Sequence, residues 1–149
     1  MKSILAAFVS FGLFLPVVRA AEPDLMTALQ VMGYGYKVKV TVNGYDAGVE
    51  GGKSEGRRLF NKASEMAAQA PPAARAKNFV LVPGVNDVVI EYTKVDPGND
   101  SLEITMQAEN YPQPVLTLVS KTRQSDKLAL KVRIDAKPAA DFKPIVIKQ

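Results

Sequence analysis

The fold of this chain is indicated most clearly by residues 34–44, which read YGYKVKVTVNG. Tyrosine or valine occupies every second position from residue 34 to residue 42, and glycine, lysine or threonine fills the positions between them. A period of two with one charged face is typical of a half-buried β-strand. The pair Asn43-Gly44 is a turn signal, so we predict that the strand ends there.

The same pattern recurs along most of the chain. Strands are predicted over residues 78–82, 88–95, 102–108, 115–120, 127–135 and 145–148, with strong turns at 83–87 and 96–100. Short strands that show one polar face indicate an antiparallel arrangement, because parallel α/β strands read as continuous apolar runs. We therefore predict a mainly β fold, an antiparallel β-sandwich of immunoglobulin-like or jelly-roll-like type. Its predicted core consists of the inward positions Tyr36, Val38, Val40, Val42, Val80, Val82, Ile90, Tyr92, Leu102, Ile104, Met106, Leu128, Leu130, Val132 and Ile134.

One segment departs from the β pattern. Between residues 54 and 70, apolar side chains recur at the i, i+3, i+4 spacing of a helix, the composition is rich in alanine, and Pro71-Pro72 follows. We therefore predict an inserted helix from about 54 to 70. Residues 21–33 fit either a short helix capped by Asp24 or a first strand.

The N-terminus has the features of an export signal. Lys2 is followed by an apolar stretch from residue 4 to residue 18, and Val18 and Ala20 are the small residues that precede a cleavage site. These features predict a signal peptide of residues 1–20 and a single mature domain of residues 21–149. An apolar stretch of this length is short for a bilayer core, so we expect no integral membrane span after cleavage. Export without cysteine favours a bacterial periplasmic or secreted protein.

The composition excludes several classes of chemistry. The 149 residues include no histidine and no cysteine, so Ser-His-Asp and Cys-His catalysis, histidine or thiolate metal sites and disulfides are ruled out. Glu91, Glu103 and Glu109 show no pairing that suits a glycosidase. We expect no catalytic residues, no metal and no cofactor. The formal net charge of +4 is too small to predict a nucleic-acid partner.

Residues 47–54, AGVEGGKS, fit a relaxed phosphate-loop pattern. The preceding strand carries Lys37 and Lys39 on an exposed face, whereas a phosphate-loop strand is buried in a parallel sheet. We interpret this stretch as a flexible glycine-rich connection.

Basic side chains gather in the last predicted hairpin, and Lys37 and Lys39 are expected to join them on an outer sheet face. Such a cluster attracts an anionic polymer or a membrane surface. Lysines on exposed strands also deter edge-to-edge aggregation, and we favour this protective role. The hairpin residues are Lys121, Arg123, Lys127, Lys131 and Arg133.

Residues 44–77 form a longer connection than a sandwich needs, and long loops are often functional. Tyr45, Asp46, Arg57 and Arg58 bring an aromatic ring, a carboxylate and two guanidinium groups close together in sequence, with Lys53 between them. We predict that these four residues bind a polar ligand, since arginine suits carboxylate and phosphate groups. The alternative is a surface helix that covers one end of the domain, with solvated arginines.

Two turn motifs carry a family resemblance. VTVNG at residues 40–44 and FVLVPGVNDVVIEY at residues 79–92 contain a V-N-G strand end and an L-x-P-G-x-N turn. In these respects the chain resembles the jelly-roll sugar-binding domains of glycoside hydrolases and the PEGA-type surface domains of bacteria. The resemblance implies a sandwich and surface-associated binding. The insertion between the motifs departs from both families, so no binding residue is carried over.

We therefore expect an exported, non-catalytic binding module of the bacterial cell envelope, whose partner is a glycan, a protein or another envelope component. The alternative is a structural or accessory subunit that binds a protein through a sheet edge or the inserted helix.

Overall fold

The computed structural model describes residues 20–69, 71, 78–98, 101–121 and 123–149. The predicted signal peptide therefore lies almost entirely outside the described residues, and its cleavage stays a prediction. Within the described ranges, no helix has both the length and the apolar character to span a membrane. The described elements are β1 (Met26–Met32), β2 (Tyr36–Val42), β3 (Tyr45–Asp46), β4 (Ser54–Phe60), α1 (Glu65–Ala68), β5 (Gly84–Lys94), β6 (Leu102–Ala108), β7 (Leu116–Ser120), β8 (Ser125–Ile134) and β9 (Ile145–Lys148).

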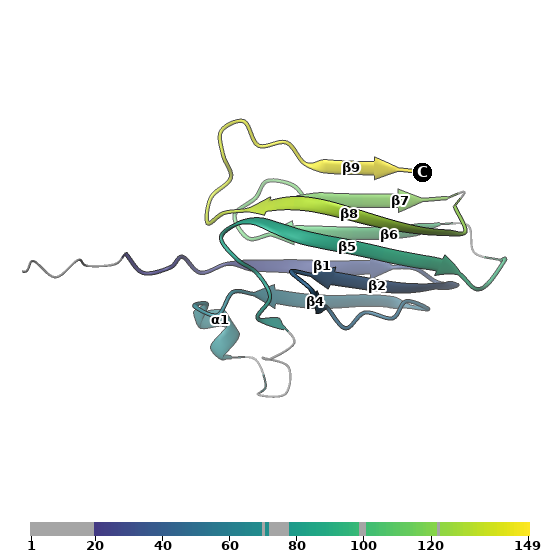
Figure 1. Cartoon of the computed structure of the whole chain (residues 1–149), viewed down its shortest axis with the longest axis horizontal. Helices are drawn as coiled ribbons and strands as arrows, with labels where there is room; N and C mark the ends of the chain where they lie inside the picture. Colours follow the sequence, from purple (N-terminus) through teal and green to yellow (C-terminus); the bar gives the residue numbers. More distant parts are fainter. Residues whose placement is uncertain (1–19, 70, 72–77, 99–100, 122) are drawn as a thin grey trace, which may run out of the picture.

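The strands form two sheets (Figure 1). One has five strands in the order β4-β1-β6-β7-β9, and the other has four in the order β3-β2-β5-β8. Neighbouring strands are antiparallel except for β7 and β9, which are parallel. The prediction of a mainly β, largely antiparallel fold is confirmed.

A single hydrophobic core joins the inward faces of both sheets. The alternation in β2 is as predicted, with Val40 and Val42 fully buried and Lys37 and Lys39 exposed. Burying one such aliphatic side chain contributes roughly 1.5–3 kcal/mol, so the inward rows dominate the stability of the fold. Most of the predicted core is confirmed. Val82 is the exception at 44% exposed, and Leu128 and Leu130 are only partly buried.

The prediction of an inserted helix over residues 54–70 is wrong. Ser54–Phe60 is strand β4, and the helix is limited to the four residues of α1. β4 pairs along its whole length with β1, from Ser54 opposite Met32 to Phe60 opposite Met26. These ladder hydrogen bonds outweigh the local helical spacing, which is a weak preference that tertiary context overrides. The same pairing settles residues 26–32 as a strand.

Polar side chains mark the end of β4. Asn61 accepts a hydrogen bond from the Leu25 N–H (3.1 Å) and donates one to the Pro23 carbonyl (2.9 Å). Asp24 accepts the Glu65 N–H at 3.1 Å, so it caps α1 and not a helix of its own segment. The predicted strand over 78–82 is reduced to an isolated bridge between Phe79 and Phe60.

The two turn motifs that carry the family resemblance meet in space. The Asn43 amide donates to the Val80 carbonyl (2.7 Å) and to Asn86 Oδ1 (2.8 Å). Asn86 is fully buried and also bonds the backbone of Val82 and Gly84. Asn43 takes a positive φ of 50° in its turn, a conformation that asparagine tolerates better than most residues. This contact between the two turns fixes the end of β2 against the first part of β5.

Candidate functional site

The four residues predicted to bind a ligand do not form one cluster. Tyr45 is 61% exposed on β3, and Arg57 and Arg58 are neighbours on β4. Successive strand residues point to opposite faces, so the two guanidinium groups diverge. Asp46 and Arg57 both hydrogen-bond to the backbone of Gly48, at its N–H and its carbonyl respectively. Asp46 accepts its N–H at 2.7 Å, and Arg57 donates to its carbonyl at 2.8 and 3.1 Å.

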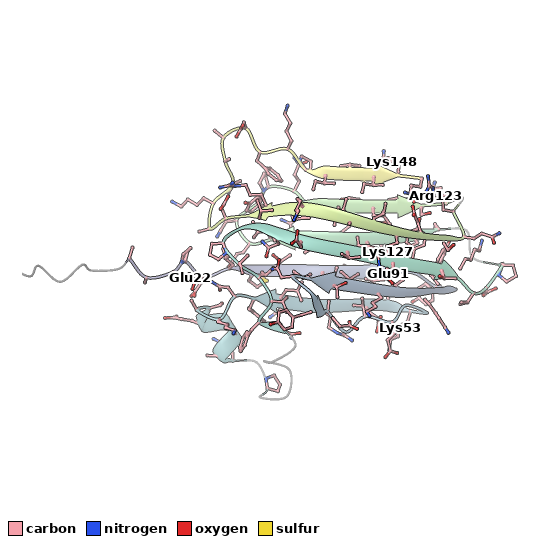
Figure 2. The ribbon with its side chains drawn as sticks, viewed as in Figure 1. Glu22, Lys53, Glu91, Arg123, Lys127 and Lys148 are labelled. Carbon is pink, nitrogen blue, oxygen red and sulfur yellow. The ribbon has the colours of Figure 1, made fainter. Side chains whose placement is uncertain are left out.

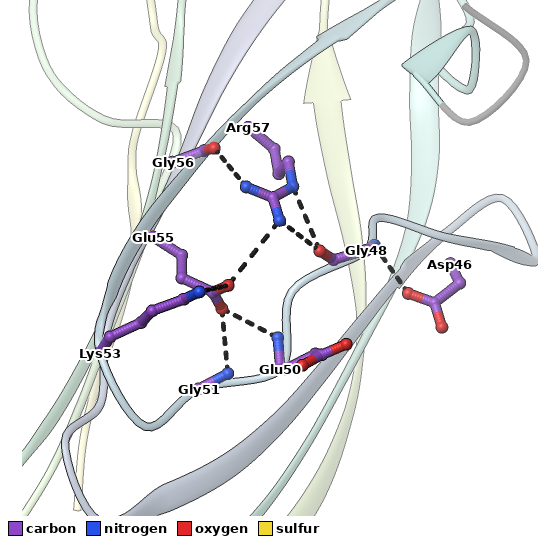
Figure 3. A network of polar contacts seen from close by, with 8 residues as sticks. All are labelled: Asp46, Gly48, Glu50, Gly51, Lys53, Glu55, Gly56 and Arg57. Atoms are coloured by element: carbon purple, nitrogen blue, oxygen red, sulfur yellow. Dashed lines mark hydrogen bonds and ion pairs between the residues drawn. The ribbon is translucent and has the colours of Figure 1, made fainter. Parts of the chain in front are cut away.

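The centre of this region is a carboxylate that sequence reasoning did not single out, that of Glu55 (Figure 3). Its side chain is only 4% exposed, and it accepts the N–H groups of Glu50 (2.9 Å) and Gly51 (3.0 Å). Lys53 and Arg57 each place a cationic nitrogen 3.7 Å from its second oxygen. Glu55 is thus held by two backbone donors and two positive charges.

The environment of Glu55 acts on its pKa in opposite directions. Burial is the largest influence and favours the neutral acid. The backbone donors of Glu50 and Gly51 and the charges of Lys53 and Arg57 together outweigh burial and lower the pKa of Glu55 below its ordinary value. The carboxylate is therefore ionised at neutral pH.

This network explains the phosphate-loop pattern of residues 47–54. The backbone donors that would face a phosphate are occupied by the chain's own carboxylate, next to Gly51 and Gly52, which both have positive φ. Gly51 also lies against β2, where an added Cβ would come within 2.2 Å of the Tyr36 carbonyl oxygen. The loop hydrogen-bonds to the edge of β2 through Val38 and Gly52. The loop therefore links the two sheets, because it hydrogen-bonds both to Glu55 of β4 and to the backbone of β2.

A second group of charged residues lies on the outer face of the four-stranded sheet. The cross-strand register sets Lys39, Glu91 and Lys127 in one row and Lys37, Thr93 and Ser125 in the next. Figure 2 shows Lys127 beside Glu91, and the two form an ion pair at 2.8 Å. We define the lysine face as the five outward cations Lys37, Lys39, Lys127, Lys131 and Arg133.

The acids near the lysine face pair with the cations of β8. Lys131 bonds Asp87, and Arg133 bonds Asp135 at 2.6 Å. The Lys127 ammonium is the main reason that the pKa of Glu91 lies below its ordinary value, with a smaller contribution from Lys39. Among the described residues, no ion pair joins Lys37 or Lys39 to an acid. Lys37 and Lys39 are therefore the two cations of the lysine face that form no ion pair in the described part of the chain.

Two open hollows meet at Lys37 and Lys39. One, of about 500 Å³, extends across β5 and β8 to Thr93 and Ser125. The other, of about 590 Å³, extends to the loop that Glu55 fastens, including Gly51. The lysine pair thus has hydroxyl groups on one side and a fixed loop on the other. This arrangement can hold an anionic group by charge and hydrogen bonds.

Within the described ranges, no three acidic side chains gather closely enough to hold a metal ion. Comparison of the chain with protein-family models, curated proteins and solved structures found no match.

Proposed function

We propose that this chain is an exported, non-catalytic binding module of the bacterial cell envelope whose ligand is an acidic glycan. The observation that supports this most directly is the pair Lys37 and Lys39, exposed on one strand face and engaged in no ion pair among the described residues, with Glu91, the acid opposite Lys39, paired to Lys127 instead. The sequence features of residues 1–20 support export to a periplasmic or secreted location. The shared core of the two sheets supports an antiparallel β-sandwich of immunoglobulin-like or jelly-roll-like type.

The chemistry of the face favours a repeating anion. Lys37 and Lys39 are two residues apart on a strand, which separates their Cα atoms by roughly 6.6 Å along the strand. An ammonium group is a compact charge on a flexible stem, so it accepts carboxylates in many orientations. Thr93 and Ser125 lie in the same row as Lys37 and offer hydroxyl groups to sugar oxygens. A polymer of uronic acids matches both features.

The test compares polygalacturonate with neutral dextran by titration calorimetry at low ionic strength. The wild-type protein is expected to bind polygalacturonate only, and the double variant Lys37→Ala/Lys39→Ala to lose about tenfold in affinity, equivalent to 1.4 kcal/mol. The matched control Lys62→Ala/Lys148→Ala removes the same charge from exposed positions elsewhere. It is expected to bind like the wild type. Equal losses in both variants, or no binding by the wild type, would reject this assignment.

The second candidate is an accessory subunit that binds a protein through a sheet edge. It is favoured by β8, a ten-residue strand at the end of its sheet. Binding through an inserted helix is no longer part of this alternative, because α1 has only four residues.

A further inference from the structure

The hydrophobic core is incompletely covered on one side of the molecule. Inward residues of β1, β2 and β6 such as Val31, Val40 and Ile104 are fully buried. The partly buried apolar residues that pack against the core all belong to β8, β9 or the connection between them: Leu128, Leu130, Ala136, Phe142, Ile145 and Ile147. The open side of the core is therefore the side of β8 and β9.

The topology gives the reason. β8 ends the four-stranded sheet, and β9 ends the five-stranded sheet on the same side. Figure 1 shows β9 lying beyond β8, with no strand of the smaller sheet drawn across it. A hollow of about 280 Å³ lies here, lined by Lys131 and Arg133 from β8 and by Phe142 and Ile145 opposite them. One further strand beside β8 would lie over β9 and cover Ile145 and Ile147.

The backbone of β8 can accept such a strand. In an antiparallel pair, hydrogen-bonded and non-hydrogen-bonded residue pairs alternate. The Lys94 N–H donates to the Gln124 carbonyl, and the Asp87 carbonyl accepts from Asn43 on the β2 side. Both contacts indicate that the even-numbered residues of β8 form the hydrogen bonds with β5. The N–H and C=O groups of the odd-numbered residues of β8, from 127 to 133, therefore point away from β5.

Both ends of this free edge are already capped by side chains. The Lys127 N–H donates to Asp126 Oδ1 at 2.8 Å, and the Asp135 N–H donates to the Tyr111 hydroxyl at 3.0 Å. Between the caps, no partner among the described residues accepts the outward N–H groups of residues 129, 131 and 133. The edge is thus open over about five residues, enough for strand addition.

The charges of β8 select the kind of strand that fits. Its outward side chains include Lys127, Lys131 and Arg133 and no acid. Each forms an ion pair that is well exposed to solvent, and exposed pairs contribute little, so an incoming carboxylate can compete for the cations. Pairing of β8 with β8 of a second copy would instead bring like charges together, which is unfavourable.

We propose that residues 129–133 of β8 bind an extended segment of a partner protein by strand addition. The segment alternates apolar side chains, which lie over the open side of the core, with acidic side chains beside Lys131 and Arg133. Its backbone completes the free hydrogen bonds of the β8 edge. This site is independent of the proposed glycan-binding pair on β2.

The test uses a fluorescein-labelled short peptide of alternating valine and glutamate, with an alternating valine and lysine peptide as the charge control. Fluorescence anisotropy is expected to show binding of the acidic peptide alone, and hydrogen exchange of the Ala129 and Lys131 amides is expected to slow in its presence. Ala129→Pro removes one outward N–H and leaves the β5 ladder intact, because proline is tolerated where the N–H faces away from the sheet. This variant is expected to weaken binding about tenfold.

Val146→Pro places the same substitution on the free edge of β9 and is expected to bind the peptide like the wild type. Circular dichroism and thermal melting are used to check that both proline variants are folded. The proposal is overturned if the acidic peptide does not bind, if both proline variants bind it equally, or if the amide protection lies outside β8. A dimer of the wild-type chain that Ala129→Pro dissociates would also overturn it, because the edge would then belong to a second copy.

Discussion

Replacing Glu55 with alanine removes the acceptor that fastens the loop of residues 47–53 to β4. The substitution leaves the N–H groups of Glu50 and Gly51 without their present partner and takes a negative charge from beside Lys53 and Arg57. Because the side chain is almost fully buried, water reaches these donors poorly in the folded protein. We therefore expect the single substitution Glu55→Ala to cause a large loss of stability.

The size of the effect follows from the two hydrogen bonds. A hydrogen bond to a charged group contributes about 1.5–3 kcal/mol, and the ion pair to the exposed Lys53 adds less than about 1 kcal/mol. Allowing for relaxation of the loop, Glu55→Ala is expected to lower the free energy of unfolding by about 3 kcal/mol. Glu55→Gln keeps an acceptor for both N–H groups but loses the charge, so about 1–2 kcal/mol is expected.

Thermal melting followed by circular dichroism measures both variants. A domain of this size loses about 3 °C of melting temperature per kcal/mol, so Glu55→Ala should melt roughly 10 °C below the wild type. Glu103→Gln, which removes a carboxylate from the outer face of β6, is the control and should melt within about 2 °C of it. If Glu55→Ala melts at the same temperature as Glu103→Gln, the hydrogen bonds that Glu55 accepts from the loop do not stabilise the fold as expected.

The pH dependence provides a second signature. The pKa of Glu55 is lower in the folded protein than its ordinary value of 4.5, so its stabilisation is complete above that pH. It is lost as the pH falls through the folded pKa. The stability difference between the wild type and Glu55→Gln is therefore expected to shrink when the pH is lowered below 4.5. A difference that stays constant or grows on acidification would contradict the charge network.

Three further predictions concern stability and are checked by the same melting assay. Arg57→Ala is expected to lower the free energy of unfolding by about 1–2 kcal/mol, because the Arg57 side chain donates two hydrogen bonds to the Gly48 carbonyl. Arg58 is exposed, so Arg58→Ala should change the free energy of unfolding by less than about 0.5 kcal/mol. Asn86→Ala is expected to cost about 2–4 kcal/mol, since it removes a fully buried side chain that hydrogen-bonds the Asn43 amide and the backbone of Val82 and Gly84; a cost under 1 kcal/mol would argue against the turn-to-turn contact. Gly51→Ala should destabilise more than Gly52→Ala, because both have positive φ but only the Cβ at Gly51 meets the backbone of a neighbouring strand.

The sequence predicts the strands whose inward side chains are all apolar. β2 and β6 show a clean alternation, so their extent and their buried faces follow from period two alone. β4 breaks this rule, because its inward positions include the polar pair Glu55 and Arg57. Without an apolar alternation, the alanine-rich stretch that follows gave the stronger local signal, and it indicated a helix. The partner that makes β4 a strand is β1, which lies more than twenty residues earlier.

The candidate site was predictable only in part. The outward orientation of Lys37 and Lys39 follows from the alternation in β2. Their neighbours Thr93 and Ser125 depend on the strand order and register of the four-stranded sheet, which no local pattern contains. Glu55 was missed for a different reason, since its main partners are backbone N–H groups. The sequence signal for this contact is Glu55 placed three residues after the pair Gly51-Gly52, whose positive φ values turn the loop back toward the carboxylate.

The most direct test of the proposed function is to map the binding face by nuclear magnetic resonance. Amide shifts of the isotope-labelled protein are followed while galacturonate oligomers are added. The largest changes are expected at Lys37, Lys39, Thr93 and Ser125, and they should diminish as salt is added, because exposed charges are screened. No saturable change, or the largest changes on the outer face of the five-stranded sheet, would contradict the assignment of Lys37 and Lys39 as the glycan-binding pair.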